Sequence, residues 1–164
     1  DGHKALVGGW GFGIGDEGSG AWLGQAAMRQ AQAAQDGRIV AGTLAQAVWQ
    51  RCGAERIALI DWCARAGQAE YAQLAPLVFD CAATDPAAER LLQDAASALV
   101  DIVRALDPPS QLPVCVMGSI ARLLQVRFPE ALKARCVAPQ GDAMDGALLL
   151  IRRQAAAAGN DPHA

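Results

Sequence analysis

The segment 8-GGWGFGIGDEGSG-20 poses the main question of this sequence. Seven glycines surround one tryptophan, one phenylalanine and the adjacent acids Asp16 and Glu17. Glycine lets a main chain adopt turns that other residues avoid and lets it come close to a neighbouring group. A loop that binds phosphate would not normally carry two carboxylates. The segment therefore indicates either a tight structural turn or a site for a ligand without negative charge.

The composition is typical of one folded domain. Of the 164 residues, 52% are hydrophobic and 19% are charged, and the net charge is −3. A chain of this length can bury a real core. Because no patch of Lys and Arg is present, we expect neither a nucleic-acid partner nor an anionic membrane surface. Because no apolar run approaches ~18 residues and no signal peptide begins the chain, we expect a cytoplasmic protein.

The cysteines and histidines do not form a metal-binding pattern. The five cysteines include no CxxC pair and fall in segments that resemble core. We expect them to be small buried side chains in a reducing compartment. His3 and His163 lie near the two ends of the sequence. No metal ligands are therefore predicted in this chain.

The hydrophobic pattern predicts an α/β protein that is rich in helices. A short strand over 4–10 should lead into the glycine-rich segment, and a helix should follow Gly18 and end near 35–37. Thr43 and Asp85 are the expected N-caps of two later helices, and Asp142 is that of the last helix. Strands are expected near 113–117 and 135–139, and the end 159–164 should be loose. The further predicted helices cover 43–53, 57–67, 76–83, 86–106, 119–128 and 143–158.

Three interpretations of the glycine-rich segment can be compared. In the simplest, Asp16 or Glu17 caps the helix and Trp10 belongs to the core. That interpretation leaves the number of glycines unexplained. A neutral, hydroxyl-rich ligand suits every part, because a carboxylate accepts hydrogen bonds from neighbouring hydroxyls and an indole covers the C–H face of a sugar ring. A sugar therefore accounts for the segment best.

A dinucleotide site is the third interpretation. Gly13, Gly15 and Gly18 fit the pattern GxGxxG, and Asp36 follows at about the expected distance. However, two acids fall where the pyrophosphate should lie, and Asp36 precedes the next apolar run instead of ending a strand. The fit is therefore poor.

The longer motif 8-GGWGFGIGDEGSGAWLG-24 resembles the signature of N-acetylglucosamine and glucosamine kinases. These enzymes belong to the BadF/BadG/BcrA/BcrD group of the actin-like ATPase superfamily. The segments 84-TDPAAERLL-92, 114-VCVMGSIARLL-124 and 139-PQGDAMDGALLL-150 follow in the family's order. The first motif is specific, and the others are persuasive only together. The resemblance implies the C-terminal lobe of an actin-like, ribonuclease H-like fold over 1–164, with a largely helical insert at about 40–107.

The resemblance also implies roles for residues in the glycine-rich segment. Trp10 would line the sugar pocket, Asp16 would accept hydrogen bonds from sugar hydroxyls, and Gly20 would approach the sugar. Glu17 would either cap the helix or act through water near a metal ion or the sugar.

A second group of residues corresponds to the nucleotide side of the family's site. Gly118 and Ser119 match the loop on the adenosine side. Thr84 replaces a glycine that lies near the adenine in relatives, which puts close backbone approach there in doubt. Asp85 is better explained as a helix cap.

The implied reaction is ATP- and Mg²⁺-dependent transfer of a phosphoryl group to the 6-hydroxyl of N-acetylglucosamine or glucosamine. The family's phosphate-binding loop and general-base aspartate belong to an N-terminal lobe that this sequence does not contain, so the chain alone should be inactive. A homodimer is also expected. Two alternatives stay open: an ATPase that activates a 2-hydroxyacyl-CoA dehydratase through an iron–sulfur cluster, and a non-catalytic sugar-binding module.

Overall fold

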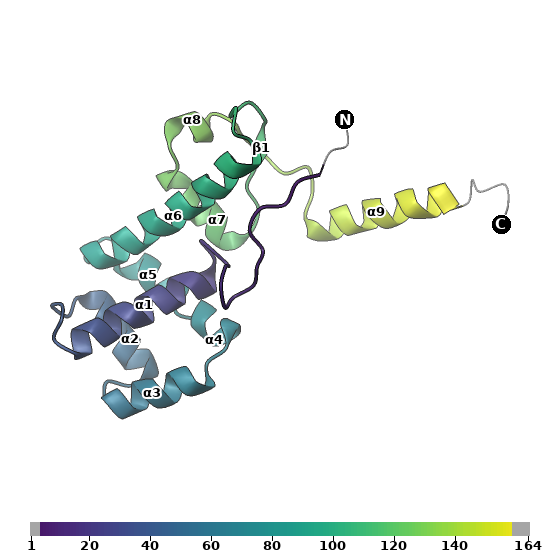
Figure 1. Cartoon of the computed structure of the whole chain (residues 1–164). Helices are drawn as coiled ribbons and strands as arrows, with labels where there is room; N and C mark the ends of the chain where they lie inside the picture. The colour runs from purple at the N-terminus through teal and green to yellow at the C-terminus, as the bar shows by residue number, and fades with distance from the viewer. Residues whose placement is uncertain (1–3, 159–164) are drawn as a thin grey trace.

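The computed structural model describes residues 4–158, and all structural statements below concern that range. The predicted loose end 159–164 and both histidines lie outside it. Helices predominate, and two short strands, β1 (Val114–Cys115) and β2 (Cys136–Val137), pair with each other. Figure 1 shows that α1 to α8 form one body and that α9 extends away from it. The helices are α1 (Gly20–Gln35), α2 (Thr43–Cys52), α3 (Arg56–Arg65), α4 (Gln68–Ala72), α5 (Ala75–Cys81), α6 (Pro86–Leu106), α7 (Ser119–Leu124), α8 (Glu130–Lys133) and α9 (Ala143–Ala158), with a 3₁₀ turn at Gln125–Arg127.

Helix α1 lies at the centre of the larger group of helices. It contacts α2, α4, α5 and α6, and its inward face is built largely from small residues. At Gly24, an added Cβ would lie 1.8 Å from the backbone oxygen of Tyr71. Helix α4 therefore approaches α1 so closely that only a glycine fits. The fully buried larger side chains of the core are Leu23, Leu44, Leu74, Leu92, Leu124, Val48 and Val78.

Asp85 holds the starts of two helices. As predicted, it caps α6, because its carboxylate accepts a hydrogen bond from the Ala87 N–H at 2.8 Å. Its other oxygen accepts one from the Leu44 N–H at 2.9 Å, in the first turn of α2. The prediction that Thr43 caps α2 is therefore wrong. Gly42 is the N-cap there, and an added Cβ on Gly42 would lie 2.2 Å from the Asp85 carboxylate.

The small sheet is parallel and pairs Val114 with Cys136 and Cys115 with Val137. A buried ion pair supports it, because the Arg135 guanidinium contacts the carboxylate of Asp107, which follows α6. Asp107 also accepts a hydrogen bond from the Leu112 N–H at 2.9 Å. The expected strand over 4–10 is absent from the described structure, since no other strand there pairs with this segment. A strand without a partner leaves its N–H and C=O groups without their ladder hydrogen bonds.

The cysteines differ in burial more than expected. Cys52 is buried, three others are half-buried, and Cys115 is exposed, so the prediction of uniformly buried thiols is wrong for Cys115. All five are free thiols. In the described part of the chain, no group of three or more His, Cys, Asp or Glu is placed to hold a metal ion. Within the same range, no helix combines the length and apolar character needed to cross a membrane.

Candidate functional site

The glycines of segment 8–20 serve two purposes. Gly18 has φ +72°, and a Cβ added there would lie 2.7 Å from the Leu99 side chain of α6. A bare main chain is therefore required for the segment to pack on α6 and to take the left-handed conformation. Gly9, Gly11 and Gly13 have nothing within 4 Å of an added Cβ. The segment thus packs on the protein at one position and borders open space at others.

Asp16 lies at the turn that leads into α1. Its φ of +68° is left-handed, which is uncommon for a residue other than glycine and is tolerated best by Asp and Asn. Its Oδ2 accepts a hydrogen bond from the Ser19 hydroxyl at 2.7 Å, and that hydroxyl accepts one from the Trp22 N–H at 3.1 Å. Ser19 is therefore the N-cap of α1. The interpretation that Asp16 or Glu17 caps this helix directly is wrong, and Asp16 instead orients the cap.

A second side chain fixes the same carboxylate oxygen. Gln68, at the start of α4, donates from Nε2 to Asp16 Oδ2 at 3.1 Å. Within residues 4–158, Asp16 Oδ1 accepts no hydrogen bond, so one oxygen is held and the other is available to a ligand. The hydrogen bonds from Ser19 and Gln68 therefore hold the Asp16 carboxylate in position without a ligand.

An open hollow of about 460 Å³ lies beside Asp16. The structure thus brings together two of the predicted sugar-binding residues, Asp16 and Gly20. Trp10 is not among the lining residues, and its side chain is 76% exposed. Glu17 is half-buried and also does not line this hollow. The lining residues are Asp16, Ser19, Gly20, Ala21, Gln68, Ala69 and Ala72.

Aromatic contacts hold the glycine-rich segment against α4. The rings of Phe12 and Tyr71 lie 5.7 Å apart, and Tyr71 meets Trp62 of α3 edge to face at 5.1 Å. Such pairs stabilise an arrangement by ~0.5–1.5 kcal/mol beyond burial. Phe12 and Gln68 were not predicted as site residues. Phe12 stood within the quoted motif, whereas no sequence signal pointed to Gln68.

The predicted adenosine-side residues lie after β1. Gly118 has φ +91°, is exposed and has no atom within 4 Å of an added Cβ, and Ser119 begins α7. A hollow of about 510 Å³ nearby is lined by the preceding Met117 and by residues of the turn before α9 and of α9 itself. Neither Gly118 nor Ser119 lines it. Asp142 caps α9 as predicted, because its Oδ1 accepts hydrogen bonds from the N–H groups of Met144 and Asp145.

Thr84 lies apart from these residues. It precedes Asp85, the N-cap of α6, whereas β1 lies beside the other end of that helix (Figure 1). Its hydroxyl lies 3.4 Å from the Cys81 carbonyl oxygen and 3.4 Å from the Thr43 hydroxyl. The structure therefore does not bring Thr84 together with Gly118 and Ser119.

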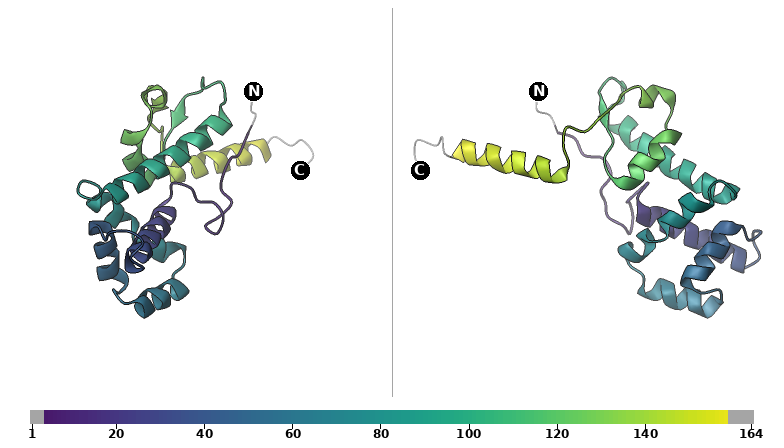
Figure 2. Two further views of the ribbon diagram at one scale, coloured as in Figure 1. Left: turned by 60° about the vertical axis from the view of Figure 1, so that its left-hand side comes forward. Right: turned by 180° about the vertical axis from the view of Figure 1, so that it is seen from behind.

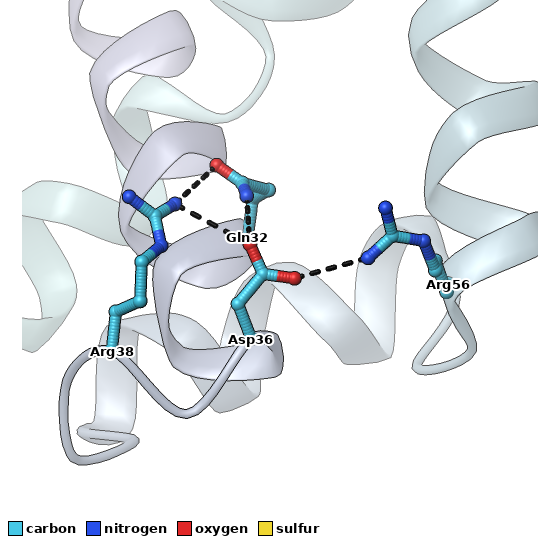
Figure 3. A network of polar contacts seen from close by, with 4 residues as sticks. All are labelled: Gln32, Asp36, Arg38 and Arg56. Atoms are coloured by element: carbon cyan, nitrogen blue, oxygen red, sulfur yellow. Dashed lines mark hydrogen bonds and ion pairs between the residues drawn. The ribbon is translucent and has the colours of Figure 1, made fainter.

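Asp36 has a structural role. It follows α1 and pairs with Arg56 of α3 at 3.1 Å and with Arg38 at 3.5 Å, while Gln32 completes the network (Figure 3). Gly15 and Gly18 are buried against the protein. The dinucleotide interpretation is therefore wrong, because neither the acid nor these two glycines are available to a nucleotide.

Comparison with known proteins agrees with the motif analysis. Residues 1–150 match the model of the BadF/BadG/BcrA/BcrD ATPase family. This chain belongs to that family. It is 33% identical over 149 residues to the glucosamine kinase GspK of Vibrio cholerae, covering 90% of this chain and 51% of the relative. The chain therefore spans about half the length of that protein.

A solved structure shows the family's fold directly. The crystal structure of a Chromobacterium violaceum protein, provisionally named an N-acetylglucosamine kinase, superposes with a TM-score of 0.87 at 45% identity. The match covers 92% of this chain and 53% of that one. These findings confirm the predicted family and its actin-like ATPase fold. Both of these relatives are named as kinases of amino sugars.

Proposed function

We propose that this chain takes part in ATP-dependent phosphorylation of an amino sugar, N-acetylglucosamine or glucosamine, at the 6-hydroxyl. It would supply sugar recognition and the adenosine-side half of the nucleotide cleft. The relatives' names support the reaction class. The observation that carries the proposal is the Asp16 carboxylate, which has one oxygen fixed by Ser19 and Gln68 and the other available beside an open hollow.

The sugar site would work by direct hydrogen bonding. An ionised carboxylate near a helix N-terminus is stabilised there and accepts hydrogen bonds from adjacent hydroxyls, each worth ~1.5–3 kcal/mol. Gly20 offers bare main chain at the wall of the same hollow. Trp10, whose indole is largely exposed, would cover the apolar face of the sugar ring. Glu17 would act through water near the sugar or the metal ion.

Gly118 and Ser119 would contact the adenosine side of ATP. The exposed glycine with open space above it suits close approach of a flat base or ribose, and Met117 adds an apolar surface in the neighbouring hollow. Thr84 lies at the opposite end of α6 from β1 (Figure 1), so we do not propose that it shares this contact with the adenosine. ATP supplies the phosphoryl group. Mg²⁺ would be held mainly by the phosphates of ATP, since the described residues include no group of three or more His, Cys, Asp or Glu placed to hold a metal ion.

We propose that phosphate binding and proton abstraction belong to residues outside the sequence 1–164. The relatives are about twice as long as the matched region. We propose that 1–164 forms a single C-terminal lobe, with the helical insert at about 40–107. An N-terminal lobe would supply the phosphate loop and the aspartate base. This chain alone would then be inactive.

The working form would be a cytoplasmic homodimer. Helix α9, which extends away from the body (Figure 1), exposes the apolar residues Met144, Leu148, Leu149, Leu150 and Ile151. A second copy would bury such a surface. Light scattering, which measures mass in solution, tests this part separately from the reaction.

The reaction is tested with the protein encoded by the complete open reading frame. ATP consumption is followed by a coupled assay with N-acetylglucosamine or glucosamine, and the position of the phosphate is read by NMR. Sugar-dependent turnover giving the 6-phosphate is expected. Absence of sugar-dependent turnover, with sugar binding retained, would overturn the kinase proposal and favour a binding module.

A further inference from the structure

A second hollow, of about 590 Å³, lies between α1 and α3, away from the Asp16 site. The spacing of three and four places its lining residues on one face of each helix. The two hollows share no lining residue. The lining residues from α1 and its end are Gln25, Met28, Arg29, Gln32, Gln35 and Asp36, those from α3 are Arg56, Leu59, Ile60, Cys63 and Ala64, and Tyr71 belongs to α4.

The hollow is bridged at both ends. The Asp36–Arg56 ion pair joins the end of α1 to the start of α3 (Figure 3), and the Trp62–Tyr71 ring contact joins α3 to α4. Between these ties, α1 and α3 do not close on each other. The hollow is therefore a space that the fold holds open.

Its floor is apolar and its rim carries charge. Met28 and Leu59 are buried at its base, and Ile60 is 56% exposed at its side. A volume of a few hundred cubic ångströms, an apolar lining and a few polar groups are the usual features of small-molecule sites. The chemistry of this lining therefore favours a compact ligand with a hydrocarbon body.

The polar groups of the rim favour an anionic end on that ligand. Arg56 shares the Asp36 carboxylate with Arg38, whereas Arg29 has no carboxylate within 4 Å among residues 4–158 and donates only a 3.5 Å hydrogen bond to Gln25. Burial, together with a hydrogen bond to Cys63, raises the pKa of Tyr71 to about 12, so this phenol stays neutral. Arg29 is thus the lining cation that no carboxylate of residues 4–158 pairs with, and it is available to a ligand.

We propose that the hollow binds a small organic anion with an apolar body. Its carboxylate pairs with Arg29, and its hydrocarbon part lies between Met28, Leu59 and Ile60. The assignment does not depend on the proposed kinase reaction, because no residue of the Asp16 site takes part.

The test uses decanoate as the anionic probe and decanol as its neutral counterpart, each titrated calorimetrically into the protein encoded by the complete open reading frame. Decanoate should bind more tightly than decanol. Arg29→Gln should weaken decanoate about tenfold or more and leave decanol unchanged, because only a charge-assisted contact is lost. Arg65→Gln, on α3 but not lining the hollow, is the matched control and should change neither affinity.

A second variant tests the location. Ala64→Trp places a large ring at an exposed position of the lining and should abolish binding of both probes, while circular dichroism verifies that the helices are intact. Equal loss for both probes in Arg29→Gln, or unchanged binding in Ala64→Trp, would overturn the proposal. The wild type could instead fail to bind decanoate and form a dimer that Ala64→Trp disrupts. That result would overturn the proposal and show that a second copy of the chain occupies the hollow.

Discussion

At the scale of single residues, Asp16 links a backbone conformation to a side-chain role. A left-handed conformation costs a residue with a side chain ~1–3 kcal/mol, and it persists where the surroundings hold it. The hydrogen bonds from Ser19 and Gln68 provide that support. Asparagine tolerates the same conformation, so Asp16→Asn removes the charge with little added strain. That property makes it the most informative substitution in the site.

The thiols give a prediction about reactivity and pH. Burial first, and then the nearby Cys63, raises the pKa of Cys52 from 9.0 to about 11. At pH 8, iodoacetamide should therefore alkylate the exposed Cys115 rapidly and Cys52 only on unfolding, as read by peptide mass spectrometry. Because the folded-state pKa of Cys52 is raised, its contribution to stability is complete below about pH 9 and is lost as pH rises towards 11. Comparable labelling of Cys52 and Cys115 in the folded chain would contradict this assignment.

Part of the candidate site could be predicted from the sequence. Asp16 and Gly20 were predictable because both stand in one motif and the start of α1 brings them to the same hollow. Gln68 was not predictable, since it meets Asp16 across 52 positions and α4 has no strong helical pattern of its own. Local patterns report contacts within a turn or two, whereas this contact depends on how α4 packs against α1.

At the scale of elements, one buried acid organises two helix starts. Asp85→Ala should lower the free energy of unfolding by about 2 kcal/mol or more, because Leu44 and Ala87 would both lose an acceptor for their N–H groups. Urea unfolding followed by circular dichroism measures the change. Asp94→Ala, an exposed acid in the middle of α6, is the matched control and should cost far less. Equal stability losses in the two variants would refute the double cap.

The meeting of α1 and α4 gives a second prediction for elements. Gly24→Ala should destabilise the chain by about 3 kcal/mol or more, because the new methyl would collide with the Tyr71 backbone and force the helices apart. Gly146→Ala in α9, where nothing lies within 4 Å, is the contrasting variant and should leave the unfolding midpoint unchanged or raised. Similar midpoints for both variants in thermal unfolding would contradict the close packing described here.

The sequence was sufficient to predict where the main helices lie. It was not sufficient to predict a helix cap supplied by a distant part of the chain. The cap and first-turn proline at Asp85 and Pro86 marked α6 correctly. Threonine is a common cap residue, but at the start of α2 the Leu44 N–H donates to Asp85, which comes from a distant part of the chain, and not to Thr43. The expected strand over 4–10 failed for a related reason, because a strand needs a partner and the apolar pattern does not name one.

At the scale of the whole molecule, the helical body and α9 differ in how they are packed. The body buries a continuous core around α1 and α6. Helix α9 projects from it, and the rear view in Figure 2 shows the same separation. The sequence predicted α9 as a helix, but its apolar residues alone could not indicate whether they face this body or another surface. The open sides of the glycine-rich segment and of α9 are where we expect the chain to meet its ligands and partner.

The most direct test of the central claim is the calorimetric affinity of the protein encoded by the complete open reading frame for N-acetylglucosamine and glucosamine, compared between wild type and Asp16→Asn. A loss of about tenfold or more for at least one of these sugars is expected, because a charge-assisted acceptor is removed. Asp80→Asn, an exposed acid outside the hollow, should change nothing. Unchanged sugar affinity in a folded Asp16→Asn variant would show that this carboxylate does not hold the sugar and would contradict the account.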